Sequence, residues 1–133
     1  MKRIIFTLFV ICSFSLPSLA SEWVNLGGGL YLDKASVRYV PKHRTYKAWV
    51  KEVKTNETVL YFNEYNLKER EWRNLDKVTT DAQNNIKKRE FNNHVGLNWL
   101  NVVPDTHSEL EYDAIYKVTL TEPKAVSVNN QKK

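Results

Sequence analysis

Residues 106–118 read Thr-His-Ser-Glu-Leu-Glu-Tyr-Asp-Ala-Ile-Tyr-Lys-Val, and this stretch decides the fold. Thr106 and Glu109 have the spacing of a capping box, in which each side chain accepts a hydrogen bond from the other residue's backbone N–H. The apolar residues that follow recur at helical spacing: Leu110, Ala114, Ile115 and Val118. We therefore predict a helix over residues 107–118 with one apolar stripe, and this stripe needs a sheet to cover.

The chain before this helix carries the pattern of an antiparallel sheet. Between residues 45 and 53, Tyr46, Ala48 and Val50 alternate with polar or aromatic neighbours, and period-two alternation indicates a strand. A short strand over 37–40 precedes it across a polar turn at 41–44. Two apolar runs, 23–26 and 30–32, flank three glycines, which predicts a hairpin because glycine reaches positive φ without steric cost.

Two interpretations of residues 57–77 stay open from the residues alone. An exposed helix is favoured by residues at spacings of three and four, namely Tyr61, Tyr65, Lys68, Trp72 and Leu75. One face of a strand is also possible, because Val59, Tyr61 and Tyr65 fit an alternating pattern. The Asp- and Asn-rich stretch 79–86 predicts a turn. Residues 95–103 are apolar around Trp99 and end at Pro104.

The N-terminus has the pattern of a secretory signal. Met1-Lys2-Arg3 is basic, residues 4–11 are apolar apart from Thr7, and Ser18-Leu19-Ala20 has the small-x-small form of a cleavage site. We predict a signal peptide over 1–20 that is cleaved after Ala20, one domain over 21–123, and a flexible polar tail over 124–133. We expect an exported bacterial protein that is periplasmic, or secreted or at the cell surface, with no transmembrane segment after cleavage.

Removing this segment changes the composition of the chain. The single cysteine, Cys12, lies inside the signal, and we expect no lipid anchor there because Ile11 is not the small residue that lipidation requires. The remaining chain has no cysteine, which excludes thiolate catalysis, disulfides and cysteine-bound metals. Its formal charge falls from +5 to 18 − 15 = +3 once Lys2 and Arg3 are removed. Nucleic acid is therefore not an expected partner, because phosphate binding calls for a strong basic face.

No catalytic motif is present. The three histidines, His43, His94 and His107, lack the spacing of a metal site, and the pair Glu69 and Glu71 lies among cations that suit a salt-bridged surface. We expect no enzyme, no cofactor and no metal. A hydrolase would require a deep pocket in which His94 or His107 lies beside a carboxylate.

Interleaved basic and aromatic residues are the feature of the sequence that indicates a binding surface. They form two clusters, the first made of Lys68, Arg70, Trp72 and Arg73, the second of Lys87, Lys88 and Arg89. Arginine and aromatic residues dominate interface hot spots. If both segments are strands, we expect the clusters to be neighbours across the 81–85 turn and to bind an acidic protein or polysaccharide. The alternative is that these charges only keep a small domain soluble.

A series of landmarks in order along the chain resembles the surface-adhesin protein E family of small exported bacterial domains. The landmarks are Trp23-Val24, Tyr31-Leu32-Asp33, Ala48-Trp49-Val50-Lys51, Glu64-Tyr65, Arg70, Arg73-Asn74-Leu75, Thr80-Asp81, Trp99 and Val103-Pro104-Asp105-Thr106. The resemblance implies an α+β fold, with an antiparallel β-sheet meander and a C-terminal α-helix packed on one face. It also implies a strand, not a helix, through residues 64–78.

The resemblance implies a function in adhesion, through binding of host extracellular-matrix or serum proteins. Members commonly carry two cysteines, at the positions that match Asn66 and residues 115–118, and this chain has neither. We expect an exported non-enzymatic domain that binds a protein partner. The second hypothesis is a periplasmic structural or inhibitor-like protein that binds an endogenous partner.

Overall fold

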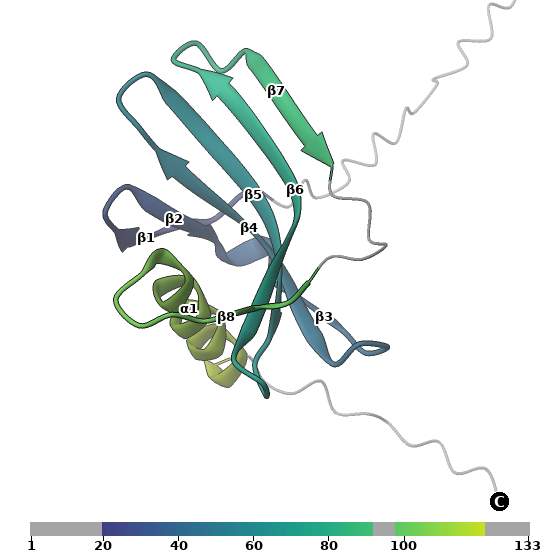
Figure 1. The fold of residues 1–133 in the computed structure, drawn as a ribbon. Helices are drawn as coiled ribbons and strands as arrows, with labels where there is room; N and C mark the ends of the chain where they lie inside the picture. Colours follow the sequence, from purple (N-terminus) through teal and green to yellow (C-terminus); the bar gives the residue numbers. More distant parts are fainter. Residues whose placement is uncertain (1–19, 92–97, 122–133) are drawn as a thin grey trace, which may run out of the picture.

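The computed structural model describes residues 20–91 and 98–121. The predicted signal peptide up to residue 19, the predicted tail and His94 lie outside these ranges. The described residues form an eight-stranded antiparallel sheet and a C-terminal helix (Figure 1). The elements are β1 (Trp23–Gly27), β2 (Leu30–Asp33), a short 3-10 helix η1 (Lys34–Ser36), β3 (Arg38–Val40), β4 (Thr45–Val53), β5 (Glu57–Asn66), β6 (Glu71–Asp81), β7 (Ile86–Phe91), β8 (Leu100–Asn101) and α1 (His107–Thr121).

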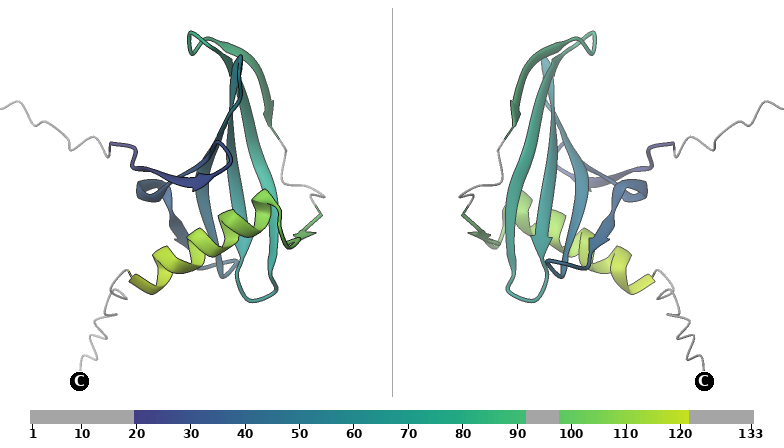
Figure 2. Two further views of the ribbon diagram at one scale, coloured as in Figure 1. Left: turned by 90° about the vertical axis from the view of Figure 1, so that its left-hand side faces the viewer. Right: turned by 90° about the vertical axis from the view of Figure 1, so that its right-hand side faces the viewer.

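The strand order confirms the predicted meander. The main path is β1-β2-β4-β5-β6-β7, β3 pairs with β4, and β8 pairs with β6. Helix α1 lies across one face of this sheet, as the two side views show (Figure 2). The α+β class and the helix on one face are therefore confirmed. Among the described residues, no helix has the length and apolar character needed to cross a bilayer.

The glycine hairpin between β1 and β2 forms as predicted. Gly27, Gly28 and Gly29 all have positive φ. Gly29 is also close to a neighbouring strand, because a Cβ added there would lie 2.8 Å from the carbonyl oxygen of Val53. The Gly29 carbonyl in turn accepts a hydrogen bond from the Val53 N–H at 2.8 Å. This contact ties the β1–β2 turn to the end of β4.

Residues 57–77 form two strands, so the helix interpretation is wrong and the single strand over 64–78 needs a correction. The chain reverses at residues 67–70, and Tyr65 of β5 pairs with Trp72 of β6. Two local features make the turn: the Asn66 side chain accepts a hydrogen bond from the Glu69 N–H, and Arg70 has a φ of 53°. The turn predicted over 79–86 is present but shorter, because β6 continues to Asp81 and β7 begins at Ile86. The Asp81 carboxylate accepts hydrogen bonds from two backbone N–H groups of this turn.

The helix begins at His107 as predicted, but its cap differs from a capping box. The Glu109 carboxylate accepts from the backbone N–H of Asp105, not Thr106, at 2.8 Å. The Thr106 hydroxyl donates to the Val103 carbonyl at 2.7 Å. The bonds shift by one residue because Asp105 has a φ of 59° and turns its N–H toward Glu109.

The buried side of α1 also differs from the predicted stripe. Ile115 and Val118 join the core with strand residues of β2, β4 and β5: Leu30, Leu32, Ala48, Val50 and Tyr65. Leu110, expected in the stripe, is 41% exposed, whereas Glu111 and Tyr112 are buried. Both buried residues find polar partners: Glu111 with Asn63 and Tyr65 of β5, and Tyr112 with the Leu67 carbonyl in the β5–β6 turn.

Candidate functional site

The face of the sheet opposite α1 carries several aromatic side chains that are exposed or half-buried. Residues that pair directly across an antiparallel ladder lie on the same face. The pairs Trp49 with Phe62 and Lys47 with Glu64 therefore share a face that is opposite the buried Ala48 and Val50. We call this side of the sheet the helix-free face. The residues on it that bear on the argument below, together with Trp99, which contacts Arg73, are Trp23, Tyr31, Lys47, Trp49, Lys51, Leu60, Phe62, Glu64, Arg73, Asp76, Arg89 and Phe91.

Aromatic rings on the helix-free face stack with each other and with cations. The rings of Trp49 and Phe62 stack with centroids 5.0 Å apart. The Lys51 ammonium lies 4.3 Å from the centroid of the Trp23 ring, and the Arg73 guanidinium lies 4.4 Å from that of Trp99. These tryptophans are half-buried, so each keeps part of its ring accessible.

A polar pocket of about 570 Å³ lies on the helix-free face, at the end of the sheet where β6 begins. At its base Glu64, which is 1% exposed by side chain, receives hydrogen bonds from the Thr45 hydroxyl at 2.6 Å and from Arg73 at 2.8 and 2.9 Å. Burial alone raises the pKa of Glu64, but the hydrogen bonds from Thr45 and Arg73 outweigh it and hold the pKa below its usual 4.5. The remaining lining residues are polar or aromatic: His43, Lys47, Asn66 and Trp99.

The structure separates the residues of the first predicted cluster. Lys68 and Arg70 lie in the β5–β6 turn, where Arg70 contacts Glu109 at 3.8 Å and the ring of Tyr112 at 4.8 Å. Trp72 packs against the core on the helix side of the sheet. Only Arg73 of this cluster belongs to the helix-free face.

The second predicted cluster lies on β7, far from the first. Lys88 pairs with Thr79 across the ladder, and Thr79 is seven residues along β6 from Trp72, or about 23 Å. The expectation that the clusters are neighbours is therefore wrong, because the tight 81–85 turn pairs the second cluster with the end of β6, whereas Trp72 and Arg73 lie at its start. Lys87 is exposed, Lys88 forms a salt bridge with Glu90, and Arg89 forms one with Asp76 at 2.9 Å.

Sequence reasoning missed Trp23, Trp49 and Phe62 as site residues. The signal was available for Trp49, which alternates with the apolar residues of β4. Alternation separates the two faces of a strand, but it does not tell which face the helix covers.

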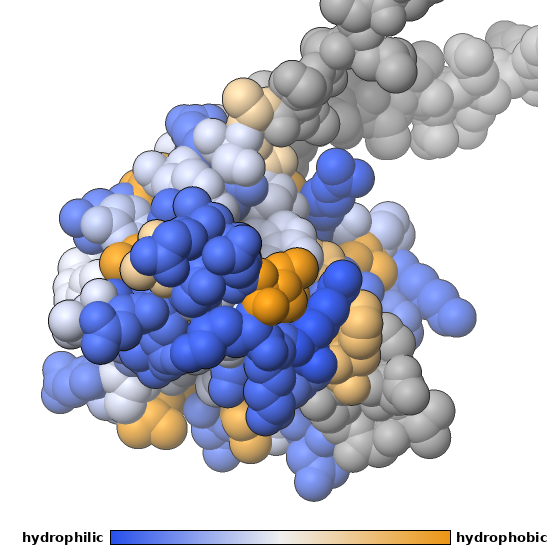
Figure 3. Space-filling model, turned by 90° about the horizontal axis from the view of Figure 1, so that it is seen from above, coloured by the Kyte–Doolittle hydropathy of each residue, from blue (hydrophilic) through white to orange (hydrophobic). Residues whose placement is uncertain are grey.

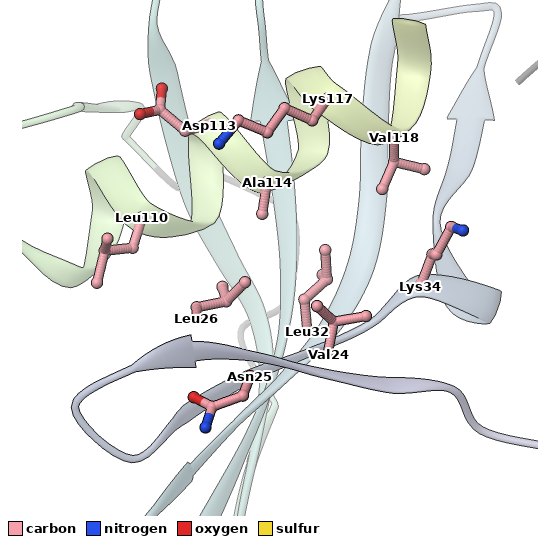
Figure 4. A pocket seen from close by; sticks show the side chains of 10 residues that line it. All are labelled: Val24, Asn25, Leu26, Leu32, Lys34, Leu110, Asp113, Ala114, Lys117 and Val118. Carbon is pink, nitrogen blue, oxygen red and sulfur yellow. The ribbon is translucent and has the colours of Figure 1, made fainter. Parts of the chain in front are cut away.

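A groove of about 480 Å³ runs between α1 and β1 (Figure 4). Apolar side chains from both elements face each other across it: Val24 and Leu26 from the strand, and Leu110, Ala114 and Val118 from the helix. Leu32 of β2 also lines the groove. Lys34, Asp113 and Lys117 bring charges of both signs to its rim. The groove explains why Leu110, at helical spacing with the core residues, stays partly exposed.

A smaller cavity of about 190 Å³ lies under the start of α1, and it bears on the hydrolase hypothesis. His107 Nδ1 lies 4.0 Å from a Glu52 carboxylate oxygen at this cavity, so one condition of that hypothesis is met. The Ser108 hydroxyl, which also lines the cavity, bonds with the Thr106 hydroxyl at 2.7 Å and accepts from the Val103 N–H. Within 20–91 and 98–121, no hydrogen bond joins Ser108 to His107, and no cluster of three or more potential ligands could hold a metal ion.

The end of the molecule where β6 meets β7 is mostly hydrophilic. Seen from this end, the surface shows charged and polar residues with only small apolar areas between them (Figure 3).

No family model, curated protein or solved structure matches this chain. The likeness to the surface-adhesin protein E family therefore stays a prediction from the sequence. The helix-free face remains the strongest candidate for a site because it combines accessible aromatic rings with cations.

Proposed function

We propose that this protein is an exported, non-enzymatic binding domain that recognises a protein partner through the helix-free face. The observation that carries the proposal is the row of Trp23, Trp49, Phe62 and Trp99 along one sheet face, with Lys51 and Arg73 stacked on its outer members. Tryptophan and arginine are the residue types that most often supply interface binding energy. The face extends over several strands, which suits a protein surface better than a small ligand.

Charge on the helix-free face favours an acidic partner. Arg73 and Arg89 are paired with Glu64 and Asp76. Lys47 and Lys51 form no salt bridge with another residue of the described ranges. Their charge is available to carboxylates on a partner, which raises association rates and selects against basic surfaces. The resemblance to the protein E family supports host extracellular-matrix or serum proteins as the class.

The test is alanine substitution on the face with a matched aromatic control. Protein from expression of the full chain is titrated by surface plasmon resonance over immobilised extracellular-matrix and serum proteins. We expect Trp49→Ala to weaken binding by about tenfold or more, as at an interface hot spot. Tyr116→Ala serves as the control because Tyr116 is 48% exposed on α1, away from the face. Equal affinities of both variants and the native protein would refute the proposed site.

The two cationic clusters need substitutions that leave the fold intact. Arg73 and Arg89 hold buried or half-buried carboxylates, so reversing them would disturb the sheet. Lys68 and Lys87 are exposed and suit the purpose better. Reduced association with Lys68→Glu or Lys87→Glu would assign that cluster to the interface. Unchanged rates for both would show that these charges serve solubility.

The endogenous-partner hypothesis predicts a different outcome. Export is checked first by N-terminal sequencing, for which we expect Ser21 at the start, and by protease accessibility on whole cells. A stoichiometric periplasmic protein recovered with the native chain, and lost with Trp49→Ala, would favour an inhibitor-like role through the same face. Accessibility on whole cells with binding to host proteins would favour adhesion.

A further inference from the structure

The cavity under α1 contains a buried carboxylate that the proposed function does not use. Glu111 is 6% exposed, and its Oε2 accepts hydrogen bonds from the Tyr65 hydroxyl at 2.6 Å and from the Asn63 amide at 3.0 Å. Its other oxygen, Oε1, accepts no hydrogen bond from the residues that the structure describes. Glu111 lines the cavity, so this oxygen is the polar atom available to an occupant.

The groups around Glu111 make the cavity electronegative. Glu52 also lines it, with one oxygen 3.7 Å from the Lys54 ammonium and the other 4.0 Å from His107 Nδ1. Glu111 has no salt bridge among the described residues, and His107 is the one basic side chain among the described lining residues. Burial raises the pKa of Glu111 above its usual 4.5 against the opposing effects of its hydrogen bonds from Tyr65 and Asn63 and of the nearby His107. Burial, followed by the charge of Glu52, raises the pKa of Tyr61 to about 12, which keeps this phenol neutral as a donor to Glu52. A buried carboxylate without a cation is costly, and a bound cation would remove that cost.

Aromatic walls complete the site. Trp72 and Tyr61 line the same cavity as the two carboxylates. The face of a tryptophan ring attracts a cation, and more strongly when the cation is desolvated. The volume of about 190 Å³ limits the occupant to a small molecule.

We propose that this cavity binds a small organic cation of the ammonium class, with Glu111 and Glu52 as its carboxylate partners and Trp72 as its aromatic wall. The site lies on the helix side of the sheet, opposite the helix-free face. It therefore stands independently of the proposed protein-binding function.

Tetramethylammonium is the probe, and the indole N–H signal of Trp72 in a ¹H–¹⁵N NMR titration is the readout. The signal is assigned with a Trp72→Phe variant, and sodium chloride at equal ionic strength controls for salt. We expect a saturable shift with a dissociation constant of roughly millimolar order, and no shift with the neutral analogue 2,2-dimethylpropanol. Absence of a saturable shift, or an equal shift with the neutral analogue, would overturn the proposal.

Two carboxylate variants test the roles of the residues. Glu111→Gln keeps an acceptor oxygen for Tyr65 but removes the charge, and we expect affinity for tetramethylammonium to fall by about tenfold. Glu52→Gln changes a residue at the mouth without touching the Tyr65 contact, so it gives a second reading if Glu111→Gln folds poorly. Native affinity in Glu52→Gln, and in Glu111→Gln where that variant folds, would contradict the assignment.

Discussion

The pair of Glu64 and Arg73 shows how one buried charge depends on its partner. Glu64 is 1% and Arg73 16% exposed by side chain. Removing one partner of a buried pair leaves an uncompensated charge, which typically costs about 3–5 kcal/mol. We expect Arg73→Met to lower the free energy of unfolding by about this amount in urea denaturation.

A second substitution in the same background separates charge from packing. Adding Glu64→Gln to Arg73→Met removes the unpaired negative charge of Glu64 and keeps an acceptor for the Thr45 hydroxyl. The double variant should recover more than half of the loss. A double variant as unstable as Arg73→Met would mean that the loss came from Arg73 packing on Trp99.

Glu111 and Glu64 predict opposite responses of stability to pH. The folded-state pKa of Glu111 is raised, so its contribution is full below the usual 4.5 and is lost as pH rises through the folded value. The pKa of Glu64 is lowered, so its contribution is present above 4.5 and is lost as pH falls. As pH rises above 4.5, the native protein should therefore lose unfolding free energy relative to the Glu111→Gln variant. A difference that stays constant over that range would contradict the raised pKa.

At the scale of single elements, the β1–β2 hairpin depends on Gly29. Alanine at this position would meet both a φ of +78° and the Val53 carbonyl oxygen at 2.8 Å. Gly27 has a φ of +100° but no atom within 4 Å of an added Cβ, so it serves as the matched control. We expect Gly27→Ala to cost about 1–2 kcal/mol from backbone strain alone and Gly29→Ala to cost more. Equal thermal midpoints for the two variants would show that the clash is relieved.

Helix α1 is held to the β5–β6 turn by a hydrogen bond from Tyr112. The Tyr112 hydroxyl donates to the Leu67 carbonyl at 2.6 Å, next to Asn66. Tyr112→Phe keeps the ring and leaves this carbonyl without its donor, which should cost about 1–3 kcal/mol. Urea denaturation checks the value, with Tyr116→Phe on the exposed side of the helix as the control. Equal stability of both variants would show that water replaces the lost donor.

At the scale of the whole molecule, the two proposed sites lie on opposite faces of one sheet. Trp49→Ala should weaken protein binding and leave tetramethylammonium binding unchanged, and Glu111→Gln should do the reverse. Titration of each variant with both probes checks this independence. A variant that weakens both interactions would indicate a change of the fold and not of a site.

Local chemistry in the sequence determined the elements that turns and periodicity specify. The glycine hairpin, the alternation of β4, the Asp81 turn and the start of the helix at His107 all depend on neighbours within a few residues. The antiparallel sheet with a C-terminal helix followed from these elements and from the family resemblance.

Tertiary structure alone decided what depends on pairing across the chain. The turn at 67–70 could not be predicted, because residues 57–77 fit both a helical and a strand periodicity. The pairing of β5 with β6 shows that these residues form two strands. The β6–β7 register, which places Lys88 opposite Thr79, separated the predicted cationic clusters. Because α1 packs on one face of the sheet, Trp49 and Phe62 lie on the helix-free face, and Glu111 is buried beside Tyr65. Local pattern tells which residues share a face, but only contacts between distant segments decide which face is covered.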